Sequence, residues 1–413
     1  MATTEHEDFA RNWPDIVSAF LRLGATAYGG PAIMGIMQAE LQEKRRWVSR
    51  ERFVEGLSVV NMLPGAMATQ PGIFLGYARG GWWGGLLGGL CFVLPGFFIM
   101  LALTIGYATL GVTPLMRGAL YGLGPVVLGI FLVAVYRLGR STTSTVAQAI
   151  IGTGAAAALI GSPLGVAAIL LLAGAAGISV FHSKKLGAVV MGALATIFAV
   201  VSVARWPTWV SVSADTGGVP QSTGLLDIGA YFFKVAAFTV GGGLTMIAFI
   251  QDQVVEQFGW LTPREFIDGL ALGQFTPGPV LMLAAYVGYK MAGVAGASVA
   301  AGAAFLPSFI LMLMVLPMLH RVRALTWTRA ALKGMGPAVI GILAVSLGRL
   351  APAALPDPFA IAMLVATVTA LLVWRVATVQ LMVAGSLLGV LRNRLFSLPG
   401  IKGACDLSLW GRV

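Results

Sequence analysis

Long apolar stretches separated by short polar ones run through almost the whole chain of 413 residues. A helix needs roughly 20 apolar residues to cross a bilayer, so the pattern predicts about thirteen membrane segments (roughly 11 to 15). Glycine and proline inside several stretches predict broken or re-entrant helices among them. The apolar stretches cover residues 14–38, 55–77, 82–108, 118–136, 146–161, 163–181, 186–204, 227–250, 265–289, 293–319, 330–349, 358–374 and 376–391.

Composition supports the membrane interpretation. Hydrophobic residues make up 58% of the chain and charged residues only 10%, against about 25% charged in soluble domains. A soluble protein would lack the polar surface that water requires. The net charge of +11 comes from basic residues scattered between apolar stretches, which is typical of loops that face anionic lipid. We therefore expect an all-α polytopic membrane protein surrounded by the lipid bilayer, with no nucleic-acid partner.

The chain also contains an internal repeat. Tryptophan, proline and arginine residues recur 212 or 213 positions later, which Gly- and Ala-rich sequence does not produce by chance. Examples are Trp47/Trp260, Pro64/Pro277, Pro125/Pro337 and Arg137/Arg349. The sequence predicts an N-terminal repeat at 14–210 and a C-terminal repeat at 225–395. The Ser-, Thr-, Gly- and Pro-rich stretch 211–224 is the expected linker, and 1–13 and 396–413 are the expected tails.

The position of the second repeat predicts its orientation. Seven apolar stretches precede it, and an odd number of crossings inverts the second copy relative to the first. Inverted repeats are typical of secondary transporters, whose substrate site lies near the bilayer midplane between the copies. Lysine and arginine divide almost equally between the two sides, so they do not establish which side faces the cytoplasm.

A first candidate site combines a basic residue with a glycine-rich break. Arg22 and Lys234 hold the same repeat position, and each precedes an interruption of the apolar stretch. The interruptions contain Tyr28, Gly29, Gly30 and Pro31 in the first repeat, and Gly241, Gly242, Gly243 and Thr245 in the second. A helix that starts after such a break presents backbone N–H groups to an anion. The alternative is close helix packing, with both basic side chains reaching the membrane interface.

A second candidate site is a Pro-Gly break flanked by amides and hydroxyls. Uncharged donors suit a partly dehydrated oxyanion, because they orient it without burying many charges. The alternative is a structural kink whose carbonyls bond the same side chains. The residues are Asn61, Pro64, Gly65, Thr69 and Gln70 in the first repeat, and Gln274, Thr276, Pro277 and Gly278 in the second.

Four carboxylates also coincide in the repeat. Glu40 matches Asp252, and Glu55 matches Asp268. A carboxylate near a transport path is a candidate proton acceptor. The alternative is an ion pair with a nearby arginine.

Motifs for other chemistry are missing from the sequence. There is no Gly-Lys-Ser/Thr phosphate loop, the three histidines are dispersed, and the two cysteines have no metal-ligand spacing. We therefore expect no cofactor, no metal, no catalytic residues and no enzymatic activity.

Several motifs together resemble the chromate ion transporter family in its long, two-domain bacterial form. They are Ala27-Tyr-Gly-Gly-Pro31, Asn61-Met-Leu-Pro-Gly65, Phe92-Val-Leu-Pro95, Trp260-Leu-Thr-Pro-Arg-Glu-Phe266 and Gln274-Phe-Thr-Pro-Gly-Pro279. The resemblance implies an inner-membrane carrier that exports chromate using the proton motive force and confers chromate resistance, with sulfate as a competitor. One departure is Ala66, where many relatives have proline.

The expected function is export of a tetrahedral oxyanion, with chromate first. A carrier of the same architecture for sulfate or another oxyanion is the first alternative, and a non-transporting membrane scaffold or enzyme is the second. A homodimer is one assembly that the sequence leaves open.

Overall fold

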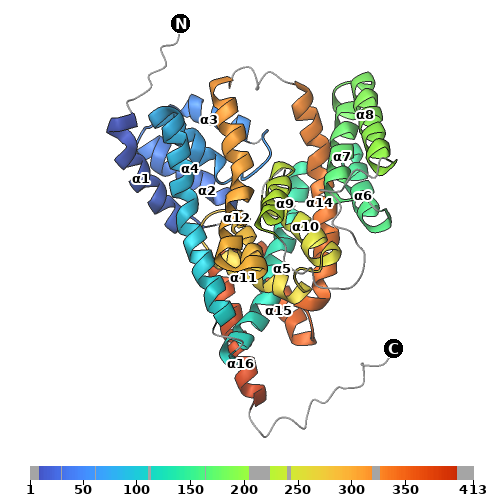
Figure 1. The fold of residues 1–413 in the computed structure, drawn as a ribbon. Coiled ribbons are helices and arrows are strands. Elements are labelled where there is room, and N and C mark those ends of the chain that lie inside the picture. Colours follow the sequence, from blue (N-terminus) through green and yellow to red (C-terminus); the bar gives the residue numbers. More distant parts are fainter. Residues whose placement is uncertain are drawn as a thin grey trace.

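The computed structural model describes residues 9–28, 30–60, 62–109, 113–162, 164–203, 224–239, 243–318 and 326–397. All regular structure in these ranges is helical, as the apolar pattern predicts (Figure 1). The N-terminal repeat consists of α1 (Phe9–Thr26), α2 (Gly30–Met37), η1 (Gln38–Lys44), α3 (Arg50–Val60), α4 (Gln70–Thr109), α5 (Pro114–Thr142), α6 (Val146–Gly161), α7 (Val166–Phe181) and α8 (Lys184–Val203).

The C-terminal repeat follows the same order of elements. It consists of α9 (Leu225–Ala237), α10 (Gly243–Ile250), η2 (Gln251–Gln257), α11 (Pro263–Phe275), η3 (Val280–Met282), α12 (Leu283–Val315), η4 (Leu316–Met318), α14 (Thr326–Ala354), α15 (Pro358–Thr369), η5 (Ala370–Trp374) and α16 (Thr378–Ser397). Both ends of α14 lie 212 positions after the ends of α5, and α16 begins 212 positions after α7. Among the described α-helices only α8 has no counterpart, and the short 3-10 helices η3 and η4 occur in the C-terminal half alone within the described ranges.

A pair of matching kinks confirms that the two copies share one backbone path. In α4 the bend lies at Gly80 (φ −147°, ψ 25°) and Gly81 (φ 62°, ψ −151°). In α12 it lies at Ala292 (φ −146°, ψ 32°) and Gly293 (φ 60°, ψ −149°). Glycine occupies the second position in both because side chains are excluded from this positive-φ region.

The two copies run in opposite directions. In Figure 1, the long arm of α4 after Gly81 descends from the α3 end of the molecule toward α16, whereas the long arm of α12 after Gly293 ascends beside it. The fold is therefore an inverted repeat. Four helices are long and apolar enough to cross a membrane, within the part of the chain that the structure describes: Gln70–Thr109, Pro114–Thr142, Val280–Met318 and Thr326–Ala354. The chain is a multi-pass membrane protein, and the count of thirteen segments stays a prediction.

The two halves are interlocked rather than merely adjacent. Helix α5 packs against α15 and α16 of the other half, and α14 packs correspondingly against α6 and α7. Small residues permit these crossings: a Cβ at Gly122 would lie 2.0 Å from the Gly385 carbonyl oxygen, and one at Gly334 would lie 2.2 Å from the Ala173 oxygen. Such contacts between small residues bring helix backbones together in membranes.

Two apolar stretches divide where the sequence predicts. Stretch 55–77 is interrupted at its Pro-Gly break, because α3 ends at Val60 and α4 begins at Gln70. The stretch that ends at 77 and the one that begins at 82 are two arms of α4, separated by non-helical backbone at Gly80 and Gly81 and packed on one another, since a Cβ at Gly76 would lie 2.3 Å from the Gly84 carbonyl oxygen. Residues 9–13 belong to α1. The linker lies outside the described residues except for Gly224, as do residues 1–8 and 398–413 of the tails.

Candidate functional site

The four breaks expected from glycine and proline occur, and they meet in pairs. Within each half, one break separates the first two helices and the other follows the short helix α3 or α11. The Gly65 N–H donates to the Thr239 carbonyl at 2.7 Å, and the Gly278 N–H donates to the Ala27 carbonyl at 2.9 Å. These two hydrogen bonds are equivalent under the repeat. The Pro-Gly break of each half therefore forms a backbone hydrogen bond with the glycine-rich break of the other half.

The Pro-Gly sequence explains the backbone shape of the break that follows α3 or α11. Gly65 has φ +117° and Gly278 has φ +98°, where L side chains are strained. The surroundings of the two glycines differ, however. A Cβ on Gly65 would lie 2.3 Å from the Ser308 Oγ, whereas the nearest atom to one on Gly278 is 4.0 Å away. The Ser308 hydroxyl also accepts the Ala66 N–H at 2.6 Å. The Pro-Gly break of the N-terminal half is therefore more tightly packed than that of the C-terminal half.

Polar side chains of these breaks are buried. Thr69 and Gln70 are fully buried, Thr245 and Thr276 nearly so, and Gln274 is half-buried. The Gln70 amide donates to the Pro64 carbonyl at 2.8 Å, which is the kink-stabilising role foreseen as the alternative. Thr69 Oγ1 and Gln70 Oε1 have no hydrogen-bond partner in the described structure. A buried hydroxyl without a partner costs free energy unless a ligand or water bonds it.

The two candidate sites are described only in part. Gly29, Gly241 and Gly242 of the first site and Asn61 of the second lie outside the described residues. Helix α2 begins at Gly30, with Pro31 next to it, and α10 begins at Gly243. Tyr28 is 40% exposed. Arg22 is exposed on α1 and Lys234 is half-buried on α9, so the structure shows neither side chain enclosed with the breaks.

Among the carboxylates, Asp268 lies in the densest polar cluster. Its Oδ1 is 3.4 Å from Arg264 Nε, and its Oδ2 accepts the Tyr107 hydroxyl at 3.2 Å. Lys290 and Glu265 form an ion pair at 2.7 Å in the same region. Helix α11 is outside the four spanning helices. Burial raises the pKa of the Asp268 carboxyl to about 6, against the opposing effect of Arg264. Glu55, its counterpart on α3, is half-buried.

Glu40 and Asp252 occupy equivalent positions but have different partners. Asp252 is 3.2 Å from Arg349 Nη1, while Glu40 lies 3.3 Å from both Lys44 Nζ and Arg45 Nε. Both carboxylates lie in short π-helical segments, Glu40 in η1 and Asp252 in η2. The Lys44 hydrogen bond lowers the pKa of Glu40, whereas burial raises the pKa of Asp252.

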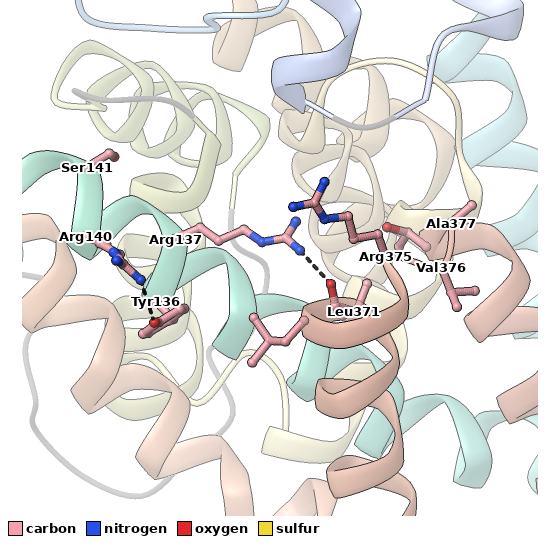
Figure 2. A pocket seen from close by; sticks show the side chains of 10 residues that line it. Tyr136, Arg137, Arg140, Ser141, Leu371, Arg375, Val376 and Ala377 are labelled. Atoms are coloured by element: carbon pink, nitrogen blue, oxygen red, sulfur yellow. Dashed lines mark hydrogen bonds between the residues drawn. The ribbon is translucent and has the colours of Figure 1, made fainter.

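Two open cavities were not foreseen. One, of about 750 Å³, lies between the end of α5 and the η5–α16 junction (Figure 2). The other, of about 410 Å³, lies beside η2 and includes Asp252 and Arg349. None of their lining residues belongs to the four breaks. The match of Arg137 with Arg349 in the repeat is a sequence signal from which these cavities could have been found.

Comparison with known proteins identifies the family. The sequence profile described as chromate transporter matches residues 14–180 and 226–390, one range within each predicted repeat. The "Chromate transport protein" of Cupriavidus metallidurans is 31% identical over 386 residues, 90% of this chain and 91% of that protein. The "Probable chromate transport protein" of Synechococcus elongatus is 34% identical over 322 residues, 76% of this chain and 78% of that protein.

A third relative gives the same result. The "Chromate transport protein" of Pseudomonas aeruginosa is 33% identical over 346 residues, 83% of this chain and 82% of that protein. No solved structure matches the chain. Since the profile covers both repeats and the three relatives align over most of their lengths, the chain belongs to the chromate transporter family.

Proposed function

We propose that the protein is a secondary active transporter that exports chromate from the cytoplasm across the bacterial inner membrane. The names of its relatives support chromate as the substrate. The inverted repeat supports the transporter class, because such repeats place a substrate site between the two copies. Export driven by the proton motive force would give the cell resistance to chromate.

The meeting of the four breaks carries this proposal. Helices α2, α4 and α10 each begin at a break, and helix N-termini attract anions through their unpaired N–H groups. The Thr69 hydroxyl is fully buried and has no partner in the described structure, next to the start of α4, which supports a role for it as a donor to an oxyanion. Thr276, Gln274 and Thr245 supply further uncharged polar groups beside the other breaks.

Charge balance and proton coupling complete the proposal. Chromate is a dianion, and Arg22 and Lys234 are the basic residues that the repeat places just before the two glycine-rich breaks. Asp268 is the proton acceptor we favour among Glu40, Glu55, Asp252 and Asp268. It is 5% exposed, and its pKa of about 6 lies close enough to neutrality for a proton to bind and leave.

The decisive experiment is uptake of chromate into inverted membrane vesicles with an imposed pH gradient. We expect concentrative uptake that sulfate reduces by competition. Thr69→Val should raise the apparent KM for chromate about tenfold, the usual effect of losing one hydrogen bond to a charged ligand. Thr104→Val is the matched control, since the equally buried Thr104 hydroxyl bonds the Met100 carbonyl of its own helix.

Other outcomes select the alternatives. Sulfate uptake that chromate does not reduce would make the protein a sulfate carrier of the same architecture. Absence of flux for any oxyanion, with protein present in the vesicles, would support a non-transporting scaffold or enzyme. Light scattering on the same purified protein tests whether it forms a homodimer.

A further inference from the structure

The two open cavities are equivalent positions in the two halves. Arg137 Nη2 donates to the Leu371 carbonyl at 2.6 Å in the larger cavity, and Arg349 Nη2 donates to the Leu159 carbonyl at 3.2 Å in the smaller one. Arg349 lies 212 positions after Arg137, and Leu371 lies 212 positions after Leu159. Each arginine thus joins its helix to the opposite half, Arg137 to η5 and Arg349 to α6. The cavities are one site in two copies.

The contents of the two copies differ. In the smaller cavity the carboxylate of Asp252 lies 3.2 Å from Arg349, and Glu256 and Gln257 complete the wall. The larger cavity has no carboxylate among the residues that line it. It holds two further arginines, Arg140 and Arg375, so three guanidinium groups share one open cavity of about 750 Å³.

The arrangement of these arginines favours a bound anion. In Figure 2, the Arg137 and Arg375 side chains extend toward one another from opposite sides, with Arg140 on the α5 side. The Ser141 and Thr378 hydroxyls also line the cavity. Like charges repel unless an anion lies among them. In the other copy, a carboxylate already occupies the equivalent place beside Arg349.

The missing carboxylate is present elsewhere in the N-terminal half. Asp252 corresponds to Glu40, which binds Lys44 and Arg45 instead of Arg137. Helix α10 also packs against α14, whereas α2 makes no comparable contact with α5. In the C-terminal half, η2 therefore covers Arg349 with the carboxylate of Asp252, and we call this half closed. In the N-terminal half, Glu40 of η1 does not reach Arg137, and we call this half open.

We propose that the cavity of Arg137, Arg140 and Arg375 binds a small tetrahedral oxyanion, and that Glu40 replaces this anion on Arg137 when the N-terminal half closes. Closure would make Glu40–Arg137 the equivalent of the present Asp252–Arg349 pair. In the exchanged state, Asp252 would release Arg349 and the smaller cavity would open to an anion. This inference rests on the proposed function for its substrate class, and it assigns an additional site away from the breaks.

Anion binding is tested without transport, on the full-length protein purified in neutral detergent. Sulfate, the probe, is titrated by calorimetry into the wild type, Arg140→Gln and Arg375→Gln, each of which leaves Arg137 to hold Leu371. We expect each variant to raise the apparent Kd about tenfold, as the loss of one charged hydrogen bond does. Arg117→Gln is the matched control, because Arg117 is exposed nearer the opposite end of α5 and outside the cavity.

The binding result has clear alternatives. Unchanged sulfate affinity in both variants would overturn the site, provided that their thermal unfolding matches that of the wild type. Arg140→Lys and Arg375→Lys replace the Gln variants if those unfold early. If phosphatidylglycerol binds in the cavity and sulfate does not, the cavity is a lipid site and the proposal is overturned. Sulfate binding here with no chromate flux in vesicles would leave this site standing while the proposed function fails.

The exchange is tested by crosslinking in a background without Cys91 and Cys405. The pair Asp252→Cys and Arg349→Cys reports the closed C-terminal half, and Glu40→Cys with Arg137→Cys reports the closed N-terminal half. We expect each pair to form a disulfide in vesicles, with no requirement for flux in these variants. A Glu40–Arg137 pair that never crosslinks, while Asp252–Arg349 does, would overturn the exchange.

Discussion

The short helices of the two halves share one sequence pattern but pack differently. In the C-terminal half, α11 contacts α4, α5, α12 and α14, while α3 of the N-terminal half packs mainly on α4 and η1. Burial follows the same division: Asp252 and Asp268 are 6% and 5% exposed, and their counterparts Glu40 and Glu55 are both half-buried. The long helices, by contrast, match to within a few degrees at their kinks. The scaffold is symmetric, and the difference is concentrated in the short elements.

This comparison teaches how one sequence repeat adopts two conformations. An inverted pair that were fully symmetric would present the same opening to both sides of the membrane. In the exchange proposed above, asymmetry in the short helices would close one side and open the other, and exchange of the two conformations would reverse them. In that proposal α4 and α12, whose kinks match, form the frame against which α2–α3 and α10–α11 move.

The largest expected effect is all-or-none and tests the inversion. Ser49 and Thr262 are exposed, equivalent residues that cap α3 and α11, each accepting a backbone N–H three residues later at 3.2 Å. A membrane-impermeant thiol reagent should modify Ser49→Cys from one side and Thr262→Cys from the other. Loss of either cap should lower the stability of the protein by a similar amount, about 1 kcal/mol. Each variant is therefore a control for the other. Equal labelling from one side would contradict the inverted fold.

The next effect compares the two Pro-Gly breaks. Gly65→Ala should destabilise the protein by about 3 kcal/mol or more, because a positive φ and a contact with Ser308 at 2.3 Å add backbone strain to overpacking. Gly278→Ala has the strain without the contact and should cost about 1–2 kcal/mol. Thermal unfolding in detergent measures both. Equal losses would show that the two breaks are packed alike, against the asymmetry described above.

A smaller effect concerns pH and the buried carboxyl of Asp268. Its folded pKa of about 6 is raised above the unfolded value of about 3.9. The stability that this group contributes is therefore fully present below about pH 4 and is lost as the pH rises through 6. The loss should be on the order of 2 kcal/mol and absent in Asp268→Asn. Unfolding between pH 4 and 7.5 measures it, with Glu55→Gln as the half-buried counterpart. A wild type and an Asn variant with the same pH slope would remove Asp268 as a proton acceptor.

The sequence predicted the repeat and all four break positions, because glycine, proline and a constant offset are local signals. It did not give the length of the non-helical segment at the first Pro-Gly break, since Leu63, Ala66, Met67 and Ala68 are apolar residues within it. It did separate the two arms of α4 near Gly80 and Gly81, where the backbone is non-helical.

Other features of the site depend on tertiary packing. Glu40 and Asp252 match in sequence, yet only the fold determines that Asp252 reaches an arginine of α14 while Glu40 stays with Lys44 and Arg45. The reciprocal bonds Gly65–Thr239 and Gly278–Ala27 likewise join residues whose proximity no local pattern encodes.

The crossed packing of α5 with α16 has a consequence for biosynthesis. The ribosome synthesises α5 long before α16. The contacts of Gly118 and Gly122 with Gly385 and Gly389 therefore form only after α16 has been inserted. During that interval the small-residue face of α5 is covered by lipid or by a membrane chaperone rather than by α16. Contacts between distant parts of a chain also form slowly. Premature release of the nascent chain after α8 would leave a product that no local refolding can complete, and quality-control proteolysis in the membrane is its expected fate.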